Sequence, residues 1–249
     1  MVKIGIIGGS GLDDPGMLRG AEQMTVDTPF GPPSSPLTCG RLNGAEVVIL
    51  ARHGRRHQFS PSQVNYRANI RALKDQGVNC ILATTACGSL REEIGRGDLV
   101  IPDQFIDFTR RRQTTFFDSF EAGPRHTSMA EPFDGRLRRA LLQTAAALQL
   151  KTHDGGTVVT IEGPRFSSRA ESRMFRLWGA DVINMSTAPE AILANEIQIP
   201  YAAVAMSTDY DCWKEDESPV TWDEILAVFK RNVANVEKLL CDTIPKLEM

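Results

Sequence analysis

The sequence lacks the cysteine patterns that hold many small domains together. Its five cysteines are odd in number and contain no C-x-x-C pair. A disulfide framework and a zinc site therefore have no support. His53 and His57 are spaced i, i+4, but their stretch, "ARHGRRHQF", has a glycine and too many cations for a helical metal site. We expect no bound metal.

The chain also lacks an apolar run long enough to span a bilayer and an excess of positive charge. Its formal net charge of -3 over 249 residues argues against a nucleic-acid-binding surface. The first residues, "MVKIGIIGG", enter a strand pattern at once. We expect a cytoplasmic protein with neither a membrane nor nucleic acid as a partner.

What is present is an alternation of short apolar runs with helical patterns. The Val-, Ile- and Ala-rich strand candidates are residues 2–7, 46–51, 79–85, 98–102, 157–161, 181–185 and 201–206. Helical spacing occurs in residues 61–77, 135–150, 167–179, 189–197 and 221–240. Asn43-Gly44 predicts a hairpin. The pattern predicts an α/β fold with a central, mostly parallel sheet flanked by helices, in a single domain spanning residues 1–249.

A glycine-rich turn, "GIIGGSGL", follows the first strand candidate. The dinucleotide fingerprint would need a glycine where Asp14 stands, and no G-K-[ST] follows, so both common nucleotide-loop motifs fail. An NAD-binding oxidoreductase is thereby set aside. The turn lets backbone N–H groups and the Ser10 hydroxyl approach an anion, although a purely structural turn remains an alternative.

Two further strand candidates end in groups that suit an anion. "ARHGRRHQFSP" brings Arg52 and His53, and "ATTACGSL" brings Thr85. Open α/β sheets bind ligands at the carboxyl ends of their strands, so these residues and Ser10 predict a phosphate cage. A solvated basic loop is the alternative reading.

Two carboxylates, Asp209 and Asp211, stand at the end of a buried strand candidate in "STDYDCW". Residues two apart on a strand point the same way, so the two side chains would share one site. Like charges that close are costly unless one carboxyl is protonated or a ligand supplies donors. The pair indicates a site, and a solvated turn is the alternative.

Two more strand ends carry candidate ligand residues. In "TIEGPRFSSRAES" a helix is capped near Ser167 or Ser168 with Glu171 in reach, and Phe166 can stack on a planar ligand. In "INMSTAPEA" Ser186 offers a hydroxyl, and Pro189 opens a helix.

In this order the segments resemble the 5′-methylthioadenosine phosphorylases of the trimeric purine nucleoside phosphorylase family. The resemblance runs from "KIGIIGGSGLDDPG" through "ARHGR", "TTACGSLREEI", "DQFIDFT", "EGPRFSSRAES" and "GADVINMS" to "TDYDCWKE", which is nearly the whole chain. It implies a homotrimer that needs no cofactor. Phosphate, as co-substrate, would attack C1′ of a purine nucleoside and release the base in purine and methionine salvage.

The resemblance also implies residue roles. Phosphate would be bound by Ser10, Arg52, His53, Thr85, Ala86 and Ser186. Nucleoside would contact Met185 at the ribose, Phe166 and Ser167 at the purine, and His126 of a neighbouring subunit, Trp222 and Leu226 at the 5′ group. Relatives usually have threonine in place of Ser186 and often a smaller aliphatic residue in place of Trp222.

The paired aspartates would then act on the departing base. We expect Asp209 to protonate or hydrogen-bond purine N7, with its pKa raised by burial and by Asp211. An ionised Asp211 would accept from the exocyclic amine, which favours adenine over 6-oxopurines. A broader purine nucleoside phosphorylase, a hydrolytic nucleosidase and a catalytically silent binding protein remain alternatives.

Overall fold

The computed structural model describes residues 2–8, 17–121, 123–215 and 222–247, with the backbone alone for residues 222–227 and 229–231. Its strands are β1 (Lys3–Gly8), β2 (Arg19–Met24), β3 (Leu37–Leu42), β4 (Ala45–Ala51), β5 (Cys80–Ser89), β6 (Leu99–Ile101), β7 (Gln104–Phe108), β8 (Thr152–Asp154), β9 (Thr157–Ile161), β10 (Val182–Asn184) and β11 (Tyr201–Tyr210). The helices are α1 (Tyr66–Asp75), α2 (Gly135–Ala147), α3 (Arg169–Leu177), α4 (Thr187–Glu196) and α5 (Trp222–Thr243), followed by the 3₁₀ turn η2 (Ile244–Lys246).

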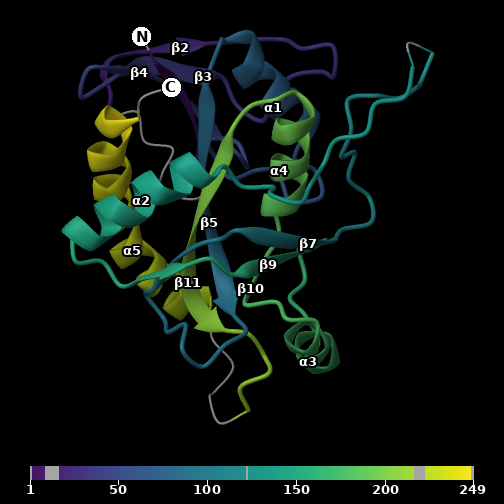
Figure 1. Ribbon diagram of the computed structural model, residues 1–249, viewed down its shortest axis with the longest axis vertical. Helices are drawn as coiled ribbons and strands as arrows, with labels where there is room; N and C mark the ends of the chain where they lie inside the picture. Colours follow the sequence, from purple (N-terminus) through teal and green to yellow (C-terminus); the bar gives the residue numbers. More distant parts are fainter. Residues whose placement is uncertain (1, 9–16, 122, 216–221, 248–249) are drawn as a thin grey trace.

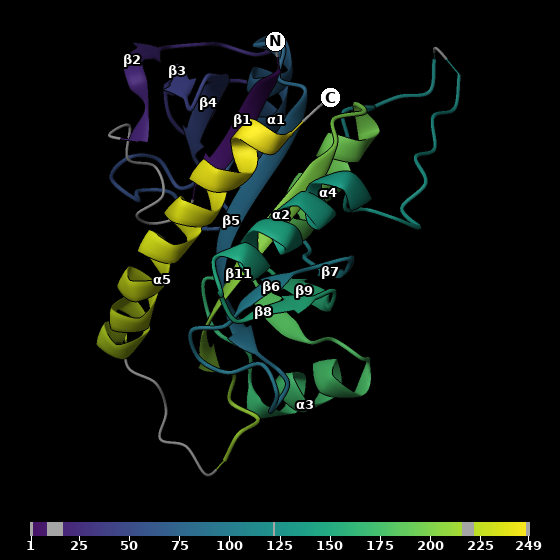
Figure 2. The same cartoon turned by 60° about the vertical axis from the view of Figure 1, so that its left-hand side comes forward.

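The strands form one mixed sheet that branches at β5. Eight strands follow the order β2-β3-β4-β1-β5-β10-β9-β7. A branch starts at β5, which also pairs with β11; β11 pairs with β6, and β6 pairs with β8. β5 is parallel to β1 over its first half and to β11 along nearly its whole length, while its end is antiparallel to β10. This long strand therefore connects the two parts of the sheet, which Figure 2 shows one above the other.

Helices cover the sheet on both faces (Figure 1). Alternate side chains of β1 point to opposite faces, so Ile7 packs with α1 and α4, whereas Ile4 and Ile6 pack with α2 and α5. A third, smaller core around Phe175 joins α3 to β9 and β10. Burial on both faces explains why the strands read as continuous apolar runs.

The predicted elements are confirmed with two kinds of difference. The hairpin is present: Leu42 pairs with Ala45 across Asn43 and Gly44, whose φ angles are 48° and 93°. β5 and β11 run several residues past their apolar cores into the polar strings that line the pocket described below. β2, β7 and β8 were not predicted, because β2 is exposed throughout and the other two are short and partly polar.

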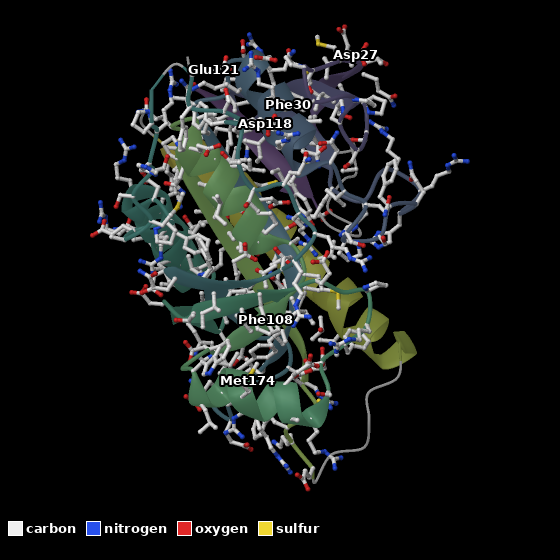
Figure 3. All side chains as sticks on the ribbon, turned by 90° about the vertical axis from the view of Figure 1, so that its right-hand side faces the viewer. Asp27, Phe30, Phe108, Asp118, Glu121 and Met174 are labelled. Atoms are coloured by element: carbon white, nitrogen blue, oxygen red, sulfur yellow. The ribbon has the colours of Figure 1, made fainter. Side chains whose placement is uncertain are left out.

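A long irregular segment, described for residues 109–121 and 123–134, connects β7 to α2 and reaches away from the sheet (Figures 1 and 2). Figure 3 places Phe108 near Met174 of α3, and Asp118 near Phe30 at the opposite end of the molecule, which is also the end where Glu121 lies. Arg67 Nη1 of α1 lies 2.9 Å from Asp118 Oδ1, and the ring centroids of Phe116 and Phe30 are 5.1 Å apart. These two contacts anchor the segment. Among the described helices, none is both long and apolar enough to cross a membrane.

Candidate functional site

A pocket of about 580 Å³ opens where several strands end. Its lining residues include some that stand at or just after the ends of five strands. They are Arg52 and His53 after β4; Thr85, Ala86 and Gly88 in β5; Pro164, Phe166 and Ser167 after β9; Met185 and Ser186 after β10; and Thr208, Asp209 and Asp211 at the end of β11. The strand-end motifs that lie within the described residues thus converge in space, as expected for ligand sites of open α/β sheets, whereas the glycine-rich turn with Ser10 lies outside those residues.

The two aspartates lie side by side over Gly88 of β5. A Cβ atom built on Gly88 would stand 3.4 Å from Asp209 Oδ2 and 3.6 Å from Asp211 Cβ. Tyr210 between them turns away, and its hydroxyl donates to the Glu92 carbonyl. The prediction that the two carboxylates face the same site is confirmed by the pocket lining.

The environments of the two carboxyl groups differ. Burial raises the pKa of Asp209 to about 6, and the nearby Asp211 raises it as well. A hydrogen bond from Thr208 favours the charged form and lowers the pKa, but it does not outweigh burial. That bond joins Thr208 Oγ1 to Asp209 Oδ1 at 2.7 Å. Asp211, with 7% of its surface exposed, accepts from the Ser167 hydroxyl at 2.8 Å. The Asp209 carboxyl therefore keeps its proton to a higher pH than an ordinary aspartate does.

Arg52 reaches the pocket already paired. Its Nε and Nη2 bind the two oxygens of Glu190 at 2.5 and 3.0 Å, and Nη1 donates to the Thr84 carbonyl at 2.8 Å. Both side chains are almost fully buried, and Tyr201 donates a further hydrogen bond to Glu190. Within the described residues these contacts use three of the five guanidinium N–H groups, so two remain for a ligand.

His53 is held as a neutral acceptor. Its Nδ1 lies 2.9 Å from the Phe59 carbonyl, which can only accept, so Nδ1 carries the proton. Burial, with a contribution from Arg52, lowers the pKa of His53 to about 4. At neutral pH its Nε2 therefore offers a lone pair.

Hydroxyl groups and a helix terminus complete this part of the pocket. Thr85 Oγ1 and Ser186 Oγ lie 3.4 Å apart, and Asn184 Nδ2 donates to Thr85 Oγ1. Ser186 is the N-cap residue of α4, so the positive end of that helix dipole points to the same place. We call Arg52, His53, Thr85 and Ser186 the anion region, and Ser167, Asp209 and Asp211 the base region.

Met185 and Phe166 border the rest of the pocket. Gly163 has a φ of 65°, and any Cβ there would collide with Met185 Sδ, so glycine is required for Met185 to take its place. The Met185 carbonyl accepts from the buried Arg112 at 2.5 Å. Phe166 is 62% exposed beside the opening, and the predicted capping box is present with Ser168 as N-cap and Glu171 as its partner.

Four predicted site residues are not brought to the pocket by the described structure. Ser10 and the side chains of Trp222 and Leu226 lie outside the described residues. His126 is exposed in the 109–134 segment, where its ring lies 5.6 Å from that of Phe120, and it is not among the pocket-lining residues. Its expected contact is with a neighbouring subunit, so that prediction stays open.

Sequence reasoning missed the residues that hold the predicted ones in place. Glu190 pairs with Arg52, Thr208 bonds to Asp209, Asn184 fixes Thr85, and Arg112 fixes Met185. A lone glutamate within the apolar helix string "APEAILA" was the one available signal. Thr208, Asn184 and Arg112 look like ordinary polar residues in the sequence.

Comparisons with known proteins agree with this geometry. The family model described as Phosphorylase superfamily matches residues 3–245. The chain is 56% identical to S-methyl-5′-thioadenosine phosphorylase of Xenopus tropicalis, over 99% of this chain and 89% of that protein, and 51% identical to the Drosophila melanogaster protein of the same name, over 99% and 86%.

Solved structures show the same likeness. Methylthioadenosine phosphorylase from Schistosoma mansoni in complex with adenine superimposes with a TM-score of 0.92 at 42% identity, covering 98% of this chain and 91% of that one. A methylthioadenosine phosphorylase from an Antarctic soil metagenomic library also gives a TM-score of 0.92, at 40% identity over 98% and 85% of the two chains. Sequence, fold and site together place this chain in the phosphorylase superfamily.

Proposed function

We propose that this protein catalyses the reversible phosphorolysis of 5′-methylthioadenosine to adenine and 5-methylthioribose 1-phosphate, a pentosyl transfer that serves purine and methionine salvage. The observation that carries the proposal is a pair of aspartates, Asp211 buried and Asp209 partly buried with a raised pKa, which face the same pocket as a built anion region. The names of relatives at 48–56% identity support the choice of nucleoside.

The anion region receives phosphate below the sugar. A phosphate oxygen attacks C1′, the bond from C1′ to purine N9 breaks, and its electron pair leaves with the base. The two remaining N–H groups of Arg52, the hydroxyls of Thr85 and Ser186, and the positive end of α4 hold the anion. His53 accepts a hydrogen bond through Nε2, so it matches the P–OH group of hydrogen phosphate. The Ser10 hydroxyl and the Ala86 backbone complete this set.

The base region receives the negative charge that develops on the purine. Asp209 in its protonated form donates to N7, which stabilises the departing base. Asp211, held by Ser167, accepts from the exocyclic amine of adenine. A 6-oxopurine places an acceptor against the same carboxylate, so adenine nucleosides are preferred over inosine and guanosine.

The remainder of the nucleoside contacts apolar groups. Met185 packs against the ribose and Phe166 stacks near the purine. The 5′-methylthio group is enclosed by Trp222, Leu226 and His126 of a neighbouring subunit in a homotrimer. An apolar enclosure favours methylthio over hydroxyl, because a buried hydroxyl without a partner is costly. The protein acts in the cytoplasm and uses phosphate as its co-substrate with no further cofactor.

One assay tests the proposal: methylthioadenosine, adenosine and inosine are each incubated with and without phosphate, and free base and sugar 1-phosphate are measured. We expect methylthioadenosine to be cleaved fastest and only with phosphate. Equal turnover of inosine would indicate a broader purine nucleoside phosphorylase. Cleavage without phosphate would indicate a nucleosidase.

Size-exclusion chromatography with light scattering tests the assembly. A trimer is expected, and a fully active monomer would contradict the shared role of His126.

A further inference from the structure

A short turn outside the pocket, Gly95–Asp98, is bonded to β11 just before Asp209. The Ser207 backbone N–H donates to the Asp98 carbonyl at 2.9 Å, and its carbonyl accepts from the Gly97 N–H at 2.8 Å. On its other side Ser207 is aligned with Cys87 of β5. Ser207 is thus held from both sides.

The regular pairing of β11 with β5 breaks immediately after this residue. Ser207 pairs with Cys87 but Asp209 pairs with Gly88, so Thr208 is an extra residue that bulges from the ladder. A bulge re-aims the side chains that follow it, and here Asp209 is the first. The orientation of Asp209 therefore depends on where Ser207 is fixed.

The turn is itself fixed by a buried carboxylate. Asp98 accepts hydrogen bonds from Lys151 Nζ and His153 Nε2, each at 2.8 Å, and from the Gly95 N–H at 2.9 Å. Burial opposes its charged form, but these three donors outweigh burial and hold the pKa of Asp98 below its ordinary value. Two of these donors, Lys151 and His153, come from the residue before β8 and from β8 itself, so β8 braces the turn.

We propose that Asp98 is a positioning residue for the reaction: by bracing the Gly95–Asp98 turn against β8 it fixes Ser207, and thereby sets where the bulge at Thr208 places the Asp209 carboxyl. Asp98 does not line the pocket, and the inference rests on the proposed role of Asp209 as the acid. A merely structural Asp98 would affect stability without affecting protonation of the base.

The experiment compares Asp98→Asn with a matched control, Asp181→Asn. Asp181 also braces two segments, since it binds Arg91 and the Thr157 N–H, each at 2.8 Å, but it lies at the opposite ends of β9 and β10 from the pocket. We expect both variants to lower Tm. For Asp98→Asn alone we expect kcat with methylthioadenosine to fall about tenfold or more, because small misplacements of reacting groups are costly. KM for phosphate should stay unchanged.

A second substrate separates positioning of the acid from general damage. N7-methylated methylthioadenosine carries a cationic base that leaves without taking up a proton. With it, the wild type and Asp98→Asn should react at equal rates. An equal loss with both substrates, or a kcat for Asp98→Asn that matches the control, would overturn the inference.

Titration of Asp209 followed by carboxyl NMR decides the question independently of turnover. Asp209 faces Asp211 on the same strand end, Thr208, and the more distant, exposed Arg96 of the turn. Because burial is the largest cause of its raised pKa, a loosened turn that admits water should move its midpoint below about 6. An unchanged midpoint would contradict the inference. A wild type without phosphorolysis would contradict the proposed function, and the midpoint would still show whether Asp98 positions the Asp209 carboxyl.

Discussion

The two ends of the pocket treat charge in opposite ways. In the anion region the Arg52 and Glu190 side chains neutralise one another, and His53 is neutral. In the base region two carboxylates face each other and one has a pKa raised to about 6. Thr85 and Gly88, which mark the two regions, are three residues apart on β5, or roughly 10 Å.

The difference indicates a division of labour. The anion region holds a charged reactant, so its donors are fixed before the ligand arrives and little rearrangement is needed. The base region has to stabilise charge that develops only during bond cleavage, and a carboxyl whose ionised form is disfavoured donates readily at that moment. Substitutions in the two regions should therefore have different signatures.

The largest effect is expected from Asp209→Asn. Removing a general acid typically lowers the rate by a factor of about 10² to 10⁴, so kcat should fall by at least about a hundredfold, with little change in KM for phosphate. Steady-state kinetics with both substrates varied measures this. A kcat near the wild-type value would show that Asp209 is not the acid.

Glu190→Gln should have the next largest effect, because Glu190 holds Arg52 of the anion region. It leaves the buried Arg52 guanidinium without its counter-charge, which typically destabilises a protein by about 3–5 kcal/mol. Denaturant unfolding measures the loss, and KM for phosphate should change with it because Arg52 is no longer held. The control is Asp75→Asn in the exposed Arg71–Asp75 pair, where a loss of less than about 1 kcal/mol is expected. Equal losses in the two variants would refute the assigned role.

The fold was largely predictable, because buried parallel strands leave continuous apolar runs in the sequence. The candidate site was predictable where residues follow such runs, as Arg52, Ser186 and Asp209 do. What holds them was hidden: the partner of Arg52 is 138 positions away, and the bulge at Thr208 depends on contacts with β5 and the Gly95–Asp98 turn. Pairings this distant along the chain have no local signature.

The stability of the unliganded protein should also report on Asp209. Its folded pKa of about 6 lies above the unfolded value of 3.8, so the unfolded state releases the proton first as pH rises. Stability contributed by the protonated group is fully present below about pH 4 and is lost as pH rises through about 6. Ionisation of Asp209 therefore lowers the free energy of unfolding at pH 7 by at most about 3 kcal/mol relative to its value below about pH 4.

Asp209→Asn should remove this pH dependence. Its free energy of unfolding should exceed that of the wild type at pH 7 and approach it near pH 4. Urea unfolding across this range, in the absence of nucleoside, measures the difference. A difference that does not vary with pH would show that the Asp209 pKa is not raised.

The smallest effect is expected from Ser167→Ala, which removes one hydrogen bond to Asp211. A bond to a charged group contributes about 1.5–3 kcal/mol at most, and exposure to the open side of the pocket lets water replace part of it. We expect KM for methylthioadenosine to rise by about threefold to tenfold, with KM for phosphate unchanged. The preference for adenosine over inosine should weaken, because a less firmly held Asp211 repels a 6-oxo group less effectively. If instead KM for phosphate changed and base preference did not, Ser167 would act on the anion region, and the separation between the two regions would fail.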